Sequence, residues 1–214
     1  VGDFLYSRSF ELMSRDGNNE ILKTISQVTT ALSEGEILEI VKTADVGTTE
    51  KDYYEIIGNK TAVLFGAACE IGAILGERSQ GERKALRNFG YNLGIAFQLM
   101  DDVLDYTSFN HVLGKRVGTD LKEGKVTLPL IYILNNSNEK DRAYIESIFD
   151  KQKITQRDFD RVRKIIEKNG GIAYAMDATE KHLDKAKKYL DMFPASHYKT
   201  ALLELADYML KREM

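Results

Sequence analysis

The sequence predicts an all-α protein assembled from several long helices. Apolar residues recur at spacings of three and four along most of the chain, as at Ile21, Ile25 and Val28, and this is the period of an amphipathic helix. Sustained alternation of β-branched and polar residues does not occur, so strand signals are nearly absent. The two prolines, Pro129 and Pro194, both stand where a helix could begin, which is the position that proline tolerates best.

Four helices are expected in the first half of the chain, near residues 3–14, 19–43, 51–76 and 80–108. The first holds the amphipathic pattern GDFLYSRSFELM, and the breaks that follow are RDGNN, DVGTT and ERSQG. The third contains the apolar run VLFGAACEIGAIL, in which Cys69, the only cysteine, is expected to be a small buried thiol. The fourth carries an apolar stripe made of Leu86, Phe89, Leu93, Phe97 and Met100.

Five helices are expected in the second half, near residues 125–136, 139–150, 155–168, 171–192 and 195–212. The stretch FNHVLGKRVGTDLKEG is expected to be a long loop before the first of them, and NNSNE and KNGG separate the next. The last two helices carry apolar stripes that include Leu183 and Leu190, and Leu202 and Met209. Together the nine segments predict a helical bundle.

Glycines inside two of these helices predict close helix–helix packing. Gly66, Gly72 and Gly76 lie in one helix, and Gly90 and Gly94 lie in the next. Each costs about 1 kcal/mol relative to alanine in a helix interior, so a compensating contact is expected. Room for a ligand between the helices is a compatible alternative.

Length and composition limit the classes of function. The chain has 214 residues, of which 43% are hydrophobic, and a formal net charge of −3, which suits one globular domain or a large part of one. This charge is too small to indicate a nucleic-acid or membrane-surface partner. No apolar run is long enough to span a bilayer, and no signal peptide is expected. Because the chain opens at Val1 within a helical pattern, we expect it to be cut from a longer protein.

The stretch FQLMDDVLDY, residues 97–106, predicts a cation site. On a helix, Asp101 and Asp105 share a face, with Asp102 beside them and Gln98 one turn earlier. A solvated acidic face is the ordinary alternative, but such a face usually continues with Lys or Arg, and the flanking residues hold no cation. Two carboxylates about 5 Å apart at an effective dielectric near 20 repel by about 3 kcal/mol, so an enclosed helix needs a cation there.

Mg²⁺ is the cation that the residues favour. Carboxylate oxygens are hard ligands, and the spacing D-D-x-x-D is not that of an EF-hand loop. Zinc is not expected, because the three histidines are far apart in sequence and Cys69 has no partner at ligand spacing. Mg²⁺ held by one or two carboxylates usually completes its shell with water and substrate phosphate, so a phosphorylated ligand is expected.

Basic residues that could meet such a phosphate lie on both sides of the aspartates. A glycine-punctuated loop after them could clamp phosphate oxygens, although an ordinary solvated loop remains open as an alternative. Its cations are Lys115, Arg116, Lys122 and Lys125. Upstream, Lys60 and Thr61 head an apolar helical segment, where a lysine at the rim of the bundle is the alternative.

Five blocks in this order resemble the trans-isoprenyl diphosphate synthases, most closely the long-chain bacterial polyprenyl type: GDFLYSRSFELM, EGEILEI, KTAVLF, FQLMDDVLDY and LGKRVGTDLKEGKVTLPLIY. The resemblance runs from Val1 to about Leu134 and continues more weakly to the C-terminus. It implies an all-α, isoprenoid-synthase-like bundle of long antiparallel helices around a central cavity. It also implies that residues 1–214 are the C-terminal two-thirds of one prenyltransferase domain, because the family's first D-D-x-x-D motif and its basic isopentenyl diphosphate site lie upstream of GDFLYSRSF.

The resemblance implies a chemistry and a set of residues. An allylic diphosphate is ionised with the help of Mg²⁺, isopentenyl diphosphate attacks head to tail, and a proton is lost, giving a linear polyprenyl diphosphate that we expect to supply a quinone side chain. Asp101, Asp102 and Lys60 are then catalytic. The family's metal ligands match Asp101, Asp102 and Asp105. Its substrate-binding residues match Lys60, Thr61, Gln98, Lys115 and Lys125, and Tyr6, Ser7 and Phe10 fall near the product tunnel unless they are ordinary core residues.

The resemblance also implies partners and a location. We expect a cytoplasmic homodimer that binds isopentenyl diphosphate and an allylic diphosphate, that binds no nucleic acid, and whose product passes to the membrane. The 214 residues alone are expected to be inactive, because the first aspartate motif is absent from them. Three alternatives stay open: a non-catalytic regulatory subunit of a heteromeric synthase, a terpene cyclase of similar fold, and a structural helical protein with an incidental acidic patch.

Overall fold

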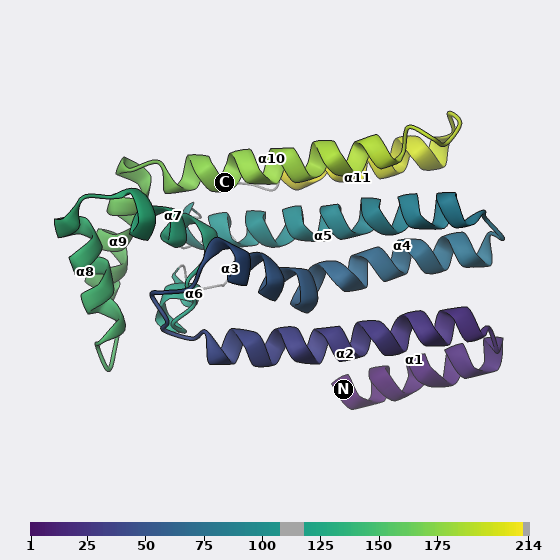
Figure 1. The fold of residues 1–214 in the computed structure, drawn as a ribbon, viewed down its shortest axis with the longest axis horizontal. Coiled ribbons are helices and arrows are strands. Elements are labelled where there is room, and N and C mark those ends of the chain that lie inside the picture. The colour runs from purple at the N-terminus through teal and green to yellow at the C-terminus, as the bar shows by residue number, and fades with distance from the viewer. Residues whose placement is uncertain (108–117, 212–214) are drawn as a thin grey trace.

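Long helices that run side by side make up most of the computed structural model, which describes residues 1–107 and 118–211 (Figure 1). No strand occurs among these residues, so the all-α prediction is confirmed. In chain order the elements are α1 (Gly2–Asp16), α2 (Asn19–Val41), α3 (Glu50–Ile57), the π-helix η1 (Gly58–Ala62), α4 (Val63–Leu75), α5 (Gln80–Thr107), α6 (Thr119–Lys122), α7 (Leu128–Asn136), α8 (Glu139–Phe149), α9 (Gln156–Lys168), α10 (Gly171–Tyr189) and α11 (His197–Lys211).

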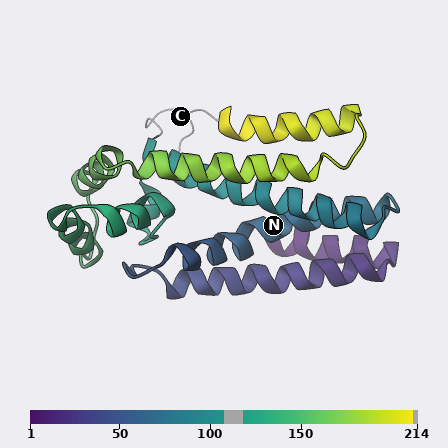
Figure 2. The ribbon, with the colours of Figure 1, turned by 45° about the horizontal axis from the view of Figure 1, so that its top comes forward.

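The helices are arranged in layers around α5. In Figures 1 and 2, α1 and α2 form one antiparallel pair, α4 and α5 form the middle, and α10 and α11 lie on the other side. The short helices α8 and α9 close one end of the molecule (Figure 1). Because α5 packs against both α4 and α10, it is the helix from which side chains can reach either half of the bundle.

Polar caps explain where several helices begin. The side chain of Asn18 accepts hydrogen bonds from two backbone N–H groups at the start of α2. Thr49 and Thr155 each form a capping box with the aspartate three residues later, at the starts of α3 and α9. Pro129 stands in the first turn of α7, as proline prefers.

The structure corrects the expected boundaries in three places. The helix expected over residues 51–76 is three consecutive segments, because the wider π turn of η1 lies between α3 and α4. Residues 125–127 are not helical, and α7 begins only at Leu128. The segment expected to be a loop contains the four-residue helix α6, which is too short to leave a periodic pattern in the sequence.

Two apolar clusters make up the core, and α5 contributes to both. One cluster joins the C-terminal half of α5 to α3 and α6–α10, and its members include Tyr106 and Phe159. The other joins the N-terminal half of α5 to α10 and α11, and its members include Phe89 and Leu183. Cys69 packs against the second cluster, and its partial burial raises the pKa of its thiol, which fits the unreactive role expected for it.

Glycines bring α4 and α5 into close contact, as the sequence predicts. A Cβ atom on Gly90 would lie 2.3 Å from the carbonyl oxygen of Phe65, and one on Gly94 would lie 2.7 Å from the Cα atom of Ala62. No side chain fits at either distance. Gly72 differs, because a Cβ atom there would meet nothing within 4 Å.

Apolar side chains on α1 and the C-terminal part of α2 remain exposed. None of the residues of α1 is buried, and Phe4 keeps 70% of its surface accessible. The other large exposed apolar residues on these two helices are Leu5, Tyr6, Leu12, Ile37, Ile40 and Val41. Exposed apolar side chains in such number are typical of a surface that contacts another molecule.

Candidate active site

The aspartate stretch forms the C-terminal end of α5, and two of its three acids, Asp102 and Asp105, have different hydrogen-bond partners. Asp102 is buried and accepts hydrogen bonds from the Tyr53 hydroxyl at 2.6 Å and from the Gln98 amide at 2.9 Å. Asp105 instead accepts from the backbone N–H groups of Thr119 and Asp120, both at 3.1 Å. In residues 1–107 and 118–211, no three acidic, histidine or cysteine side chains are already gathered around one point that could hold a metal ion.

Asp105 thus has a structural task that the sequence did not indicate. Its carboxylate fixes the turn that starts α6, and this turn carries Asp120 toward the other two acids. Asp120, which the sequence analysis did not single out, lines the same cavity as Asp101 and Asp102. The acids that share the cavity are therefore Asp101, Asp102 and Asp120.

The charges of these acids are poorly compensated by the protein. Burial, followed by the neighbouring charge of Asp120, raises the pKa of Asp102 to about 8, although the hydrogen bonds from Tyr53 and Gln98 act in the opposite direction. Burial and the charge of Asp105 raise the pKa of Asp120 to about 6, against the lowering effect of Lys125. A divalent cation among these oxygens would relieve the repulsion, so the donor set fits Mg²⁺ or Ca²⁺.

Lys60 and Thr61 lie on η1 and face the same cavity. The hydroxyl of Thr61 donates to Gln98 Oε1 at 3.1 Å, so Thr61, Gln98 and Asp102 form one continuous hydrogen-bonded chain that ends at Tyr53. The amide of Gln98 is thereby fixed in one orientation, with its NH₂ group toward the carboxylate.

Two glutamates of α2 hold Lys60. Its ammonium group pairs with Glu39 and, at 3.1 Å, with Glu36. Burial by itself would lower the pKa of Lys60, but the two carboxylates outweigh it and raise the pKa, so Lys60 stays charged. Gly35 permits this arrangement, because a Cβ atom on it would lie 2.6 Å from the backbone nitrogen of Lys60.

Lys125 reaches the cavity from the segment between α6 and α7. Its ammonium group lies 2.9 Å from Glu123 and 3.4 Å from Asp120. Burial would lower its pKa, but these acids raise it and keep the side chain cationic. Of the other expected loop cations, Lys115 and Arg116 lie outside the described residues, and Lys122 donates to Gln156 on α9 at 3.2 Å, away from the aspartates.

One cavity of about 230 Å³ collects most of these side chains. Its polar lining includes Lys60, Thr61, Gln98, Asp101, Asp102, Asp120 and Lys125. Apolar residues Ile56, Ile57 and Val126 complete its wall. Carboxylates and ammonium groups thus share one partly apolar cavity, which is an arrangement suited to a metal-bound phosphate.

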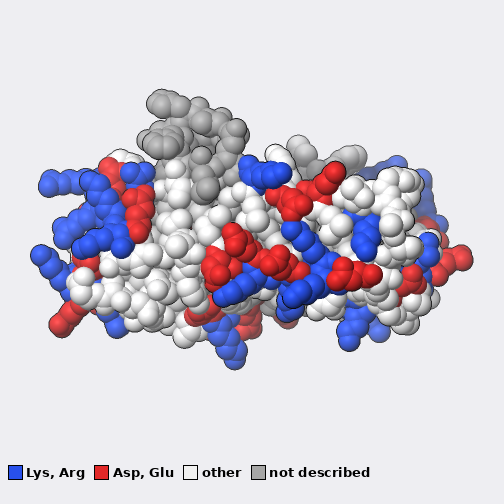
Figure 3. Space-filling model, turned by 90° about the horizontal axis from the view of Figure 1, so that it is seen from above, with Lys and Arg blue, Asp and Glu red and all other residues white. Residues whose placement is uncertain are grey.

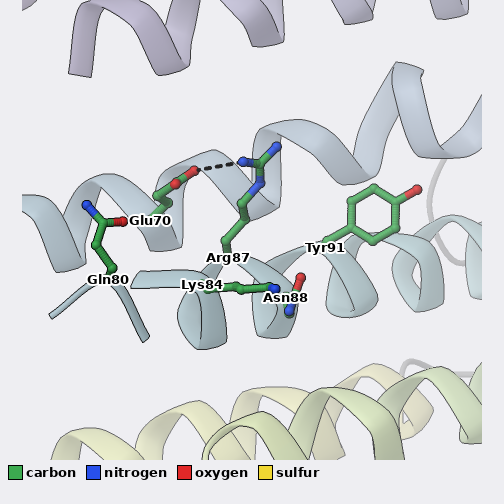
Figure 4. A pocket seen from close by; sticks show the side chains of 6 residues that line it. All are labelled: Glu70, Gln80, Lys84, Arg87, Asn88 and Tyr91. Atoms are coloured by element: carbon green, nitrogen blue, oxygen red, sulfur yellow. Dashed lines mark ion pairs between the residues drawn. The ribbon is translucent and has the colours of Figure 1, made fainter. Parts of the chain in front are cut away.

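A larger cavity of about 450 Å³ lies elsewhere, between α4 and the N-terminal half of α5 (Figure 4). It holds an ion pair between Arg87 and Glu70 at 3.6 Å, together with Lys84 and Tyr91. None of the residues that the sequence analysis selected lines it. The smaller cavity is therefore the candidate active site.

Tyr6, Ser7 and Phe10 do not line this cavity. They lie on α1, where the rings of Tyr6 and Phe10 contact each other with centroids 4.9 Å apart. Tyr6 is exposed, so the alternative of ordinary core packing does not describe it either.

Comparison with known proteins identifies the family of the chain. The sequence profile of the family described as Polyprenyl synthetase matches residues 1–167, which is most of the chain. The chain belongs to the polyprenyl synthetase family. Octaprenyl diphosphate synthase of Haemophilus influenzae is 38% identical over 206 residues, a match that covers 96% of this chain and 62% of that protein. Octaprenyl diphosphate synthase of Escherichia coli is 34% identical, and the match covers 100% of this chain and 66% of that one.

Solved structures of polyprenyl synthetases share the fold. A polyprenyl synthase from Caulobacter crescentus, complexed with calcium and isoprenyl diphosphate, superposes with a TM-score of 0.94 at 39% identity, covering 100% of this chain and 65% of that one. A decaprenyl diphosphate synthase from Rhodobacter capsulatus superposes with a TM-score of 0.92 at 34% identity, covering 100% and 66%. The chain therefore spans a little less than two thirds of the length of these relatives. None of its described helices has the length and apolarity needed to cross a bilayer.

Proposed function

We propose that the full-length protein is a trans-prenyltransferase that joins isopentenyl diphosphate to an allylic diphosphate and releases a linear polyprenyl diphosphate. The observation that carries this proposal is the cavity in which Lys60 and Lys125 face Asp101, Asp102 and Asp120. Family membership supports it, and so do relatives that are octaprenyl diphosphate synthases. Of the alternatives, a purely structural helical protein does not explain why opposite charges lie together in one cavity.

We assign the metal to the acids that line the cavity. Asp101, Asp102 and Asp120 would hold Mg²⁺, while Asp105, which the sequence also predicts as a ligand, would act by fixing the α6 turn. Bound Mg²⁺ supplies positive charge that stabilises the departing diphosphate. The calcium complex of the Caulobacter relative supports a divalent cation without distinguishing Mg²⁺ from Ca²⁺.

The chain's own residues would bind and orient the allylic substrate. Lys60 and Lys125 would meet the diphosphate oxygens, which requires Lys60 to exchange Glu36 and Glu39 for the substrate. The allylic C–O bond then breaks with its electron pair going to the diphosphate. The double bond of isopentenyl diphosphate forms the new C–C bond, and a proton is lost. Ile56, Ile57 and Val126 would keep water away from the cationic carbon.

Four finer predictions accompany the proposal. We propose that the protein acts as a homodimer, which the exposed apolar residues of α1 and α2 support. A role in making quinone side chains and a location in the cytoplasm stay predictions from the resemblance. The inactivity of the 214 residues by themselves also stays a prediction.

The deciding experiment is incubation of the full-length protein with isopentenyl diphosphate, a short allylic primer and Mg²⁺, followed by sizing of the products. Elongated prenyl diphosphates are expected. Asp101→Ala should reduce turnover by at least about 100-fold, because one carboxylate of the metal site is lost while the fold is kept. The role of this face is wrong if the variant keeps activity within a few-fold of the parent. Purified protein that makes no elongated product with any short primer would contradict the proposed function itself.

A further inference from the structure

A line of four exposed cations runs along α9, outside the candidate active site. Arg157, Arg161, Lys164 and Lys168 are spaced by four, three and four residues, and all four are exposed. At 3.6 residues per turn they fall within roughly 60° of the helix circumference and extend over about 16 Å. We call these four residues the α9 stripe. The opposite side of the helix is buried in the core.

The charge around the α9 stripe differs in sign from that of the whole chain. Residues 151–168 contain seven Lys or Arg and three Asp or Glu, although the 214 residues together carry a net charge of −3. One of the three acids, Asp158, is buried and paired with Lys151. Figure 3 shows Lys and Arg side chains gathered at the end of the molecule that α8 and α9 form. The total charge of the sequence therefore conceals a basic surface.

Among the residues that the structure describes, none forms an ion pair with a cation of the stripe. The pairs formed in this segment by the described residues are Lys151 with Asp158 and Arg163 with Glu167, and neither includes a member of the stripe. Arg161 lies over the ring of Tyr144 on α8, with its guanidinium carbon 3.6 Å from the ring centroid, and it remains exposed. The α9 stripe is therefore an exposed row of positive charge at this end of the molecule.

We propose that the α9 stripe docks the protein on an anionic membrane surface. Each Lys or Arg near such a surface strengthens binding by about fivefold, so four in one row suffice for reversible attachment. The choice of a membrane rests on the proposed function, because a long isoprenoid product is too apolar to leave into water. Attachment of this kind needs no spanning helix, and none of the described helices could be one.

The stripe is also placed close to the candidate active site. Phe159, on the buried side of α9, stacks on Tyr106 with ring centroids 6.1 Å apart, and Tyr106 directly follows Asp105. Docking through α9 would therefore hold the end of the bundle that contains the aspartates near the lipid surface.

The test compares binding of the full-length protein to vesicles of neutral phosphatidylcholine and to vesicles that also contain phosphatidylglycerol. We expect salt-sensitive cosedimentation with the anionic vesicles only. The variant R157Q/R161Q/K164Q/K168Q should bind these vesicles at least about 50-fold more weakly. The control K181Q/K185Q/K188Q/K211Q removes the same number of exposed positive charges from α10 and α11, and its affinity for the vesicles should fall by less than about fivefold.

Three results would overturn the proposal: no preference of the parent for anionic vesicles, equal losses in the two variants, or tighter binding of the stripe to a labelled oligonucleotide than to vesicles. Synthase activity without vesicles is measured in parallel and should be the same in all three proteins. Because vesicle binding is read without turnover, a protein that docks but makes no product would refute the proposed function and leave the docking intact.

Discussion

Tyr53 and Gln98 together occupy both carboxylate oxygens of Asp102, and this explains how an acid can stay in a buried position next to Asp101. Burial and the charge of Asp102 raise the pKa of Tyr53, so its hydroxyl remains protonated and can only donate to the carboxylate. A hydrogen bond to a charged group contributes about 1.5–3 kcal/mol, and a larger cost follows when a buried partner is left without it. Tyr53 thus fixes the position of Asp102 and lowers its pKa, against the larger effect of burial.

Tyr53→Phe tests this role. Removal of the hydroxyl should raise the pKa of Asp102 further and weaken Mg²⁺ binding of the full-length protein by about 10-fold or more. Titration calorimetry with Mg²⁺ and a diphosphate analogue measures the effect. Tyr106→Phe is the matched control, because that buried tyrosine faces Thr127 at 3.3 Å instead of an acid. Equal metal affinities in the parent and Tyr53→Phe would rule out the positioning role.

The raised pKa values of Asp102 and Asp120 predict a pH-dependent stability in the absence of divalent cation. Both values, about 8 and about 6, lie above the ordinary 3.8, so the folded state binds these protons more tightly than the unfolded chain does. This contribution is complete below about pH 4 and is lost as the pH rises through 6 and 8. The free energy of unfolding should therefore fall between about pH 5 and pH 8 in urea titrations with a chelator. A profile that rises over this window would contradict the assignment, and Asp102→Asn should flatten the decline.

Residues that act locally could be predicted from the sequence, whereas residues that act through long-range contacts could not. Asp101, Asp102 and Lys60 stood out because a charged residue in an apolar helix violates the local pattern. Tyr53 leaves no such signal, because its contact with Asp102 joins residues 49 positions apart. Glu39, inside the block EGEILEI, gives no local signal for the same reason, since its partner Lys60 lies 21 residues later.

At the scale of elements, the contact between α4 and α5 sets the position of η1. Gly94 on α5 meets Ala62, the last residue of η1, at a distance that excludes any side chain. Lys60 and Thr61 are therefore held against α5 by backbone contact and not only by their own hydrogen bonds. The periodic pattern predicted both long helices, but it could not predict η1, because a π turn changes the hydrogen bonding of the backbone without changing the kinds of residue that it uses.

Gly94→Ala and Gly72→Ala should act in opposite directions. The methyl group at position 94 would displace η1 and destabilise the protein by about 1–3 kcal/mol, as overpacking of a core does. The methyl group at position 72 meets open space, so the better helix propensity of alanine should stabilise the protein by up to about 1 kcal/mol. Chemical denaturation of the two variants measures both changes. Equal effects would mean that the two helices tolerate separation at Gly94.

At the scale of the whole molecule, apolar side chains are buried on some helices and exposed on others. The core clusters bury α5 and α10 thoroughly, whereas α1 and the end of α2 keep large apolar side chains in contact with solvent. The bundle architecture was predictable from helix period and break residues alone. The exposure of apolar side chains on α1 and α2 was not predictable, because it depends on which helix faces pack together in three dimensions. In the sequence, the apolar stripes of α1 and α5 look alike.

Dimerisation of the full-length protein is the expected consequence. Light scattering after size exclusion should give twice the mass of one chain at micromolar concentration. The double variant Ile37→Glu/Ile40→Glu should shift the mass toward one chain if these exposed side chains lie in the interface. Substitution of Lys23 and Lys51, which are exposed and polar already, provides the control. A single-chain mass for the parent at all concentrations would contradict the prediction.

The wide turn of η1 has a consequence for register. In a regular α-helix, residues eight positions apart, such as Tyr53 and Thr61, point about 80° away from each other. For the same rotation about the helix axis, a π segment contains one residue more than an α-helix does. Tyr53 and Thr61 are therefore oriented as residues seven positions apart in an α-helix would be, nearly in line. Tyr53 can therefore reach Asp102 while Thr61 reaches Gln98. If residues 58–62 were regular α-helix at the same chain length, one of the two would turn about 80° away from α5.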